Sequence, residues 1–191
     1  VETVRGWKTI PAPEMTQERC LSLATAVATF CDQQINHGRP LLSATLPSGE
    51  RSQFVIPPAC DAGKVSITIR LPAKFSKTLE QYEQDGFFDE ILEQQQSLGD
   101  HDQELLELRR SRNYAEFFRK AVLYHKNIVV AGATGSGKTT FMKSLVNHIP
   151  DQERLVTIED ARELFIRQPN VVHLLYSKGG QSASNVTAKN C

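Results

Sequence analysis

A glycine-rich motif at residues 132–139 constrains this chain more than any other feature. The sequence there reads GATGSGKT, which fits the pattern G-x-x-x-x-G-K-[ST] at every fixed position. Such a loop works at the opening of a helix, where backbone N–H groups, the lysine and the positive end of the helix dipole surround an anion. A chance match in a chain of this length is expected in less than about 1% of cases. The motif therefore predicts a nucleotide-phosphate site.

The residues around the motif predict the elements that this site needs. An apolar run near 128–131 predicts a buried strand before the loop. The apolar stripe after the loop predicts a helix that ends before Pro150. Further strands are predicted near 155–158 and 171–175. Strand, loop, helix and strand in this order are typical of a βαβ unit.

Each type of residue in the loop has a chemical role. Glycine permits positive φ and lets backbone N–H groups approach an anion. Lys138 brings a mobile positive charge to the β- and γ-phosphates, and the Thr139 hydroxyl can ligate Mg²⁺. The predicted nucleotide-binding residues are Gly132, Ala133, Thr134, Gly135, Ser136, Gly137, Lys138, Thr139 and Thr140.

Carboxylates follow the strand predicted at 155–158. Because the carboxyl ends of parallel strands meet at the ligand crevice, Glu159 and Asp160 are expected near the phosphate loop. There they could orient Mg²⁺-bound water or polarise an attacking water. The alternative is an acidic helix N-terminus favoured by the dipole, which would also account for Glu163 one turn later. Position alone does not decide between the two.

The first 72 residues predict a small α+β domain. Residues 17–35 carry a helical apolar stripe with Thr16 as the N-cap, 41–56 read as two strands around a turn at 47–50, and 64–70 alternate as a strand. Residues 73–112 are polar and predict a linker with helical segments. The P-loop domain is expected over 113–191.

Composition excludes several classes of protein. Lys plus Arg and Asp plus Glu are balanced at 22 each, and no basic or aromatic stripe supports direct nucleic-acid binding. The four cysteines have no zinc-site spacing and are too few for a disulfide scaffold, so free thiols are expected. No apolar stretch is long enough to span a membrane. The chain opens at Val1 in mid-pattern, which favours a fragment.

Longer segments resemble a known family. The run GATGSGKTT, followed after a helix by IPDQERLVTIEDARELF, resembles the traffic ATPases of type IV secretion systems. These belong to the secretion ATPase superfamily that also drives type II secretion and type IV pili. The resemblance extends upstream through RPLLSATLPSGER, SITIRLP and LEQYEQDGFF, and downstream to SNVTAKNC, in the order of the family.

The resemblance implies a fold and an activity. It implies a RecA-like P-loop domain, incomplete here and lacking the Walker B strand and the histidine box, after an N-terminal domain that is incomplete at its start. The activity implied is ATP hydrolysis, with ATP and Mg²⁺ as cofactors, that energises pilus assembly and the transfer of DNA or protein. The partners implied are other copies of the chain in a hexameric ring and other secretion-system components. The ring would lie peripherally on the cytoplasmic face of the bacterial inner membrane. With only three predicted strands after residue 126, the 191 residues alone are expected to be poorly stable and inactive.

The resemblance also implies roles for particular residues. Lys138, Glu159 and Glu163 become the candidate catalytic residues, and Thr139 and Glu159 the candidate metal ligands. By pattern alone Arg51 and Arg70 are surface arginines, but "GER" and "TIR" match segments whose arginines reach the nucleotide phosphates from the N-terminal domain.

Two other functions stay open from the sequence. One is a P-loop phosphotransferase acting on a small substrate, although the extra N-terminal domain suggests neither a lid nor an acceptor pocket. The other is a nucleotide-gated assembly module that binds ATP without hydrolysing it.

Overall fold

The computed structural model of the chain describes residues 1–191 except 4, 73–76, 90–98 and 178–185. The chain divides into two compact units: Val1–Leu71 together with Val130–Cys191, and Pro72–Val129. Parts of the expected linker and of the segment SNVTAKNC lie outside the described residues. The predicted boundaries at 72 and 112 stay predictions.

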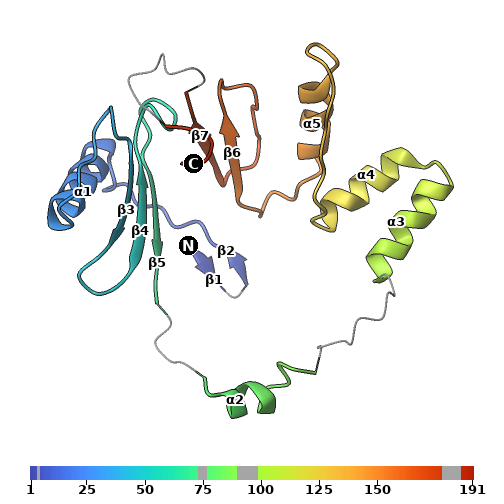
Figure 1. Cartoon of the computed structure of the whole chain (residues 1–191), viewed down its shortest axis with the longest axis horizontal. Coiled ribbons are helices and arrows are strands. Elements are labelled where there is room, and N and C mark those ends of the chain that lie inside the picture. The colour runs from blue at the N-terminus through green and yellow to red at the C-terminus, as the bar shows by residue number, and fades with distance from the viewer. Residues whose placement is uncertain (4, 73–76, 90–98, 178–185) are drawn as a thin grey trace. The chain divides into compact units, whose positions relative to one another are not determined.

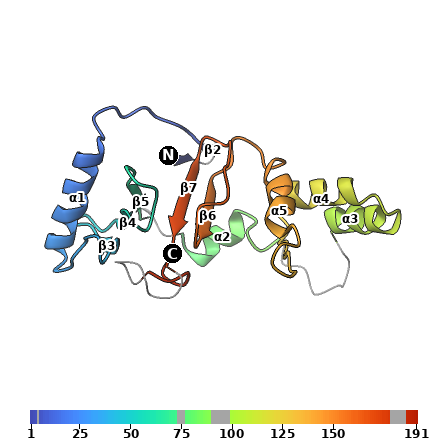
Figure 2. The ribbon, with the colours of Figure 1, turned by 90° about the horizontal axis from the view of Figure 1, so that it is seen from above.

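The N-terminal part of the first unit is a helix packed on a small antiparallel sheet. Strands β3 (Leu41–Thr45), β4 (Arg51–Val55) and β5 (Ser66–Arg70) pair in chain order, and helix α1 (Gln17–Phe30) covers one face of this sheet (Figure 1; Figure 2). The helix begins where expected, because the Thr16 hydroxyl accepts a hydrogen bond from the backbone N–H of Arg19 at 3.3 Å. The predicted helix, hairpin and third strand are therefore confirmed.

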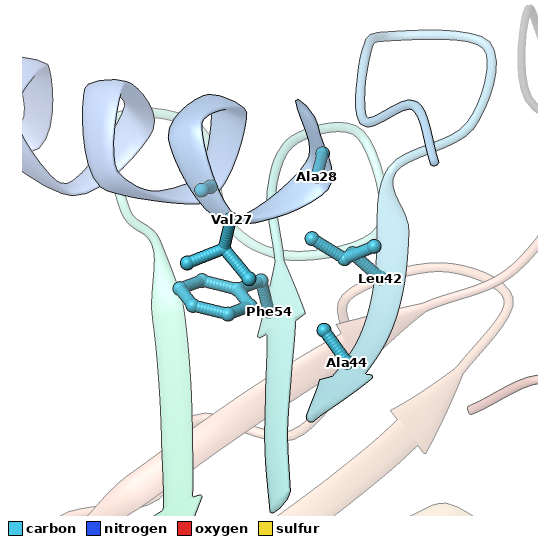
Figure 3. Close-up of a cluster of buried hydrophobic side chains, with 6 residues drawn as sticks. Val27, Ala28, Leu42, Ala44 and Phe54 are labelled. Atoms are coloured by element: carbon cyan, nitrogen blue, oxygen red, sulfur yellow. The ribbon is translucent and has the colours of Figure 1, made fainter. Parts of the chain in front are cut away.

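A small apolar core holds α1 to this sheet. Phe54 of β4 is fully buried under Val27 and lies beside Leu42 and Ala44 of β3 (Figure 3). Because side chains alternate along a strand, the neighbours of Phe54 on β4 point to the other face of the sheet. That second face carries Arg51 and Gln53, and its Val55 is buried in a second core.

The C-terminal part of the first unit carries the glycine-rich loop at 132–139, which is called the phosphate loop after its predicted role. Helix α5 (Lys138–Val146) is followed by strands β6 (Leu155–Glu159) and β7 (Val171–Leu175), which pair in parallel. A second core joins the two parts of this unit and includes Val55, Ala59, Cys60, Leu174 and Val186. The backbone N–H of Leu175 also donates to the carbonyl of Ala59 at 2.8 Å. A short N-terminal hairpin, β1 (Glu2–Thr3) with β2 (Gly6–Trp7), completes the unit.

The second unit is helical. It contains α2 (Leu79–Gln84), α3 (Asp100–Arg110) and α4 (Tyr114–Leu123). Helices α3 and α4 contact each other through Tyr124, whose hydroxyl donates to the Glu104 carboxylate. None of the helices in the described ranges is both long and apolar enough to cross a membrane.

The strand predicted at 128–131 is wrong. These residues form no strand, and Val129 is 92% exposed. A strand needs a neighbouring strand to bond with, and β propensity alone does not supply one. Within the described residues β6 and β7 form a two-stranded sheet to which the segment before the loop does not add a strand. The order observed is loop, helix, strand and strand, within a mixed α/β fold.

Candidate functional site

The phosphate loop has the conformation that its glycines were expected to allow. Gly135 and Gly137 have φ of 78° and 85°, which side chains disfavour, and Gly137 is the N-cap of α5. Gly132 lies close to Ser136: a Cβ there would lie 2.7 Å from the Ser136 hydroxyl, which would have to rotate away. A turn bond from the Ser136 N–H to the Ala133 carbonyl, at 3.2 Å, closes the loop. The loop ends at a helix N-terminus whose N–H groups can face an anion.

Lys138 occupies the loop interior. Its ammonium group donates hydrogen bonds to the carbonyls of Gly132 at 2.9 Å and Ala133 at 2.6 Å. The charge is thus held over the loop, at the place where phosphate oxygens are expected to bind.

A cavity beside the loop gathers the other candidate groups. It has a volume of about 460 Å³ and lies between α5 and β6. Thr139 lines it from the loop side, and Glu159, Asp160 and Glu163 line it from the end of β6 and the turn that follows. The structure therefore brings together the predicted metal-ligating hydroxyl and the predicted carboxylates.

Glu159 closes the turn that follows β6. Its Oε1 accepts hydrogen bonds from the backbone N–H groups of Glu163 and Leu164, each at 2.9 Å, and its Oε2 accepts from the Thr157 hydroxyl at 2.8 Å. Burial favours the neutral carboxyl, but these hydrogen bonds outweigh burial and lower the pKa of Glu159. The group is thus ionised and already engaged, while the side chain of Glu163 is exposed at the cavity. Residues 160–170 form no helix, so the alternative of an acidic helix N-terminus is wrong.

Two residues that sequence reasoning missed hold Glu159 in place. Thr157 and His173 are register partners on β6 and β7, and the Thr157 hydroxyl lies 2.8 Å from His173 Nδ1. Because the hydroxyl donates its single proton to Glu159, His173 Nδ1 must be the donor to Thr157. Burial, aided by the charge of Arg162, lowers the pKa of His173 and keeps the ring neutral. Strand alternation puts Thr157 and Glu159 on one face, so Thr157 could have been found from the sequence. His173 could not, because its role depends on the β6–β7 register.

Arg51 and Arg70 come together on the other sheet. They are directly opposite each other on β4 and β5, on the face away from α1. Both line a cavity of about 480 Å³ with Thr45, Gln53 and Thr68. Neither arginine forms an ion pair with another described residue. Two unpaired guanidinium groups at one cavity can bind an oxyanion at two points.

The donors at the loop cavity fit Mg²⁺ better than a softer metal. Among the described residues no three His, Cys, Asp or Glu side chains gather as a metal cluster. The cavity offers oxygen atoms from Thr139, Asp160 and Glu163. Mg²⁺ prefers oxygen ligands and takes few from the protein when nucleotide phosphates supply the rest.

Comparisons with known proteins identify relatives of this chain. The profile of a family described as "Type II/IV secretion system protein" matches residues 22–190. The type IV secretion system protein VirB11 of Brucella suis is 48% identical over 185 residues, covering 96% of this chain and 51% of its own length. VirB11 of Bartonella quintana is 41% identical over 200 residues, and PtlH of Bordetella pertussis is 45% identical over 177, with 98% and 92% of this chain covered and 56% and 51% of theirs.

A solved structure is similar as well. The crystal structure of the VirB11 ATPase from the Brucella suis type IV secretion system, in complex with sulphate, matches with a TM-score of 0.88 and 49% identity. The match covers 92% of this chain and 54% of that one. The chain thus spans about half the length of the relatives it matches. With a family profile that covers most of its residues and relatives this similar, the chain belongs to the type II/IV secretion system protein family.

Proposed function

We propose that this chain is the ATP-binding part of a motor subunit that hydrolyses ATP to energise type IV secretion. One observation carries the proposal: the cavity of about 460 Å³ that Thr139 of the phosphate loop shares with the carboxylates at the end of β6. The VirB11 and PtlH relatives support the choice of secretion among the activities of P-loop proteins.

In this proposal each group has a defined task. Lys138 would exchange its two loop carbonyls for the β- and γ-phosphates of ATP, and Thr139 with Glu163 or Asp160 would hold Mg²⁺. Mg²⁺, when bound, neutralises the charge that develops on the phosphates. Glu159 contributes to catalysis by orienting the turn, because it accepts hydrogen bonds from two backbone N–H groups of that turn. It could ligate the metal ion only if those hydrogen bonds broke. Glu163 is the carboxylate we assign to orienting the attacking water.

Arg51 and Arg70 are assigned to phosphate contact. Sulphate has the tetrahedral oxyanion form of a phosphate, so a related ATPase crystallised with sulphate supports oxyanion sites in this family. The two arginines would bring the N-terminal part of the chain to the nucleotide. Because a ligand shifts a conformational equilibrium only through differential contacts, such arginines would couple nucleotide binding to domain movement.

The finer assignments follow the resemblance to traffic ATPases. We propose a RecA-like P-loop domain, a homo-oligomer in the form of a hexameric ring, and contact with other secretion-system components. The ring would lie peripherally on the cytoplasmic face of the bacterial inner membrane. Direct nucleic-acid binding is not part of the proposal.

A nucleotide-gated module that does not hydrolyse ATP is the second candidate. The observation that favours it is Glu159, whose two carboxylate oxygens are already engaged by three donors. ATP binding without turnover in the full-length protein would select this candidate over the motor.

Lys138→Ala tests the proposal. In the full-length protein we expect ATP turnover to fall to background, because no other loop residue carries charge to the phosphates. Lys143→Ala is the matched control, since Lys143 is an exposed lysine on the same helix. Circular dichroism should show the same fold in both variants. Turnover near wild type in Lys138→Ala would overturn the phosphate-site assignment.

A further inference from the structure

The turn that carries Asp160 and Glu163 is held from two sides. From one side Glu159 accepts the backbone N–H groups of Glu163 and Leu164. From the other side Arg162 fixes the same turn, because its Nε donates to the Leu164 carbonyl at 3.2 Å. Arg162 itself donates through NH1 to the carboxylate of Asp61. Asp61 belongs to the N-terminal part of the chain, 101 residues away in sequence.

This ion pair is partly shielded from water. The side chains of Arg162 and Asp61 are 29% and 20% exposed, whereas the Arg167–Asp151 pair is 61% exposed on both sides. Partial burial strengthens an ion pair relative to one in open solvent. The hydrogen bond from Arg162 lowers the pKa of Asp61, which keeps the carboxylate ionised.

Asp61 is anchored where the N-terminal part meets the C-terminal part. The preceding residues Ala59 and Cys60 are buried in the core shared with Leu174 of β7. A shift of the N-terminal part would therefore displace the Asp61 carboxylate, and with it the guanidinium group that positions the turn.

We propose that Arg162 is a positioning residue that transmits the position of Asp61 to the carboxylates beside the phosphate loop. The proposal rests on the proposed ATPase function and adds a route by which the N-terminal part of the chain controls it. When the ion pair is formed, the turn presents Glu163 and Asp160 to the cavity that contains Thr139. When it is broken, one of the two supports of the turn is lost. ATP binding, which depends on the loop, continues, while the chemical step slows.

A double-mutant cycle on the full-length protein tests this route. The variants are Asp61→Asn, Arg162→Gln and the two together, with kcat and the KM for ATP measured in excess Mg²⁺. We expect each single variant to lower kcat about 3–10-fold with KM changed less than about 2-fold, and the double variant to be no slower than the slower single one. Arg162→Lys, which keeps the charge, is expected to stay within about 2-fold of wild type.

Lys64→Gln is the matched control. Lys64 pairs with the same Asp61 carboxylate at 3.4 Å but makes no described contact with the turn, so its loss is expected to leave kcat within about 2-fold. Losses that multiply in the double variant, or single variants with unchanged kcat, would overturn the positioning role. If kcat is unchanged while Lys138→Ala still abolishes turnover, this inference fails and the proposed function stands. If Lys138→Ala retains turnover, the proposed function fails and this inference fails with it.

Discussion

Arg51 and Arg70 are two like charges directly opposite each other on neighbouring strands, and this arrangement bears on the proposed ligand. Like charges directly opposite on neighbouring strands destabilise a sheet, and no acidic residue of the described chain pairs with either arginine. An oxyanion between them would remove this repulsion. Phosphate contact is therefore the role that we propose for the pair.

Removing either arginine tests this reading. We predict that Arg51→Ala or Arg70→Ala weakens ATP binding and slows turnover by about 10–10²-fold, the loss of one charged hydrogen bond. Fluorescent-nucleotide titration and turnover of the full-length protein measure both effects. Arg39→Ala, which removes another exposed arginine of the same unit, is the control. Unchanged nucleotide affinity in both variants would end the assignment.

Cys60 provides a test of burial at the residue scale. Burial in the second core, together with the charge of Asp61, raises the pKa of its thiol to about 11. Because only the thiolate is alkylated, about one thiol in a thousand is reactive at pH 8. We predict that iodoacetamide labels Cys20 before Cys60 in the native protein and labels both equally after denaturation, as measured by mass spectrometry. Equal labelling of Cys20 and Cys60 in the native protein would show that solvent reaches Cys60 in the second core.

At the scale of elements, periodicity predicted most of what forms locally. The stripe at 17–35, the alternation at 41–56 and the helix after the phosphate loop each depend on nearby residues, and each formed. Helix α1 ends at Phe30, however, so the last five residues of the predicted stripe are not helical. The strand at 128–131 failed because a strand is a property of two segments. Its apolar sequence favours a strand but does not supply the neighbour that would bond with it.

The sequence also predicted those residues of the candidate site that follow from local patterns. The motif located Lys138 and Thr139, and strand polarity located Glu159 near them. The Thr157–His173 contact needed the β6–β7 register, and the Asp61–Arg162 pair needed the packing of segments 101 residues apart. No pattern in a single sequence encodes such distances, so these partners required the structure.

The C-terminal end of α5 depends on one buried amide. Gln168 is 2% exposed, and its Nε2 donates to the carbonyls of Val146 at 3.1 Å and Ile149 at 2.8 Å. We predict that Gln168→Leu, which preserves size but removes the donor, lowers the free energy of unfolding by about 1 kcal/mol. Two partly buried carbonyls lose their donor, but the buried Gln168 Oε1, which accepts no hydrogen bond from the described residues, is removed as well. Urea denaturation measures the change. Gln152→Leu on the exposed turn nearby is the control, and an equal loss in that variant would contradict the capping role.

At the scale of the whole molecule, apolar packing, the Leu175–Ala59 backbone hydrogen bond and the shielded Asp61–Arg162 ion pair join the two sequence-distant parts of the first unit. The second core excludes water around Ala59 and Leu174. The Asp61–Arg162 pair adds a contribution that depends on the charge of Asp61, which also faces Lys64 and His173.

This contribution has a defined pH range. The folded pKa of Asp61 lies below the usual value of 3.8, so its stabilisation is complete above that pH and is lost as pH falls through the folded pKa. We predict that Asp61→Asn lowers the free energy of unfolding by about 1 kcal/mol at pH 7 and pH 5, and by less at pH 3. Urea denaturation at the three pH values measures the difference in the free energy of unfolding between wild type and Asp61→Asn. Asp151→Asn, which removes the exposed ion pair with Arg167, is expected to change the free energy of unfolding little. A difference between Asp61→Asn and wild type that grows in acid would contradict the stabilising role of the Asp61 carboxylate.

The connection between β6 and β7 is unusual because parallel strands are ordinarily joined through a helix, and residues 160–170 contain none. The amides of Glu163 and Leu164 are therefore protected by a single carboxylate, that of Glu159, rather than by a helical ladder. Exchange of these two hydrogens with deuterated solvent consequently reports the state of that side chain. If Glu159 leaves the turn to ligate Mg²⁺ when nucleotide binds, both amides exchange faster; if it remains, their exchange is unchanged or slower. Deuterium uptake at these two amides thus distinguishes a Glu159 that ligates the metal ion from one that stabilises the turn.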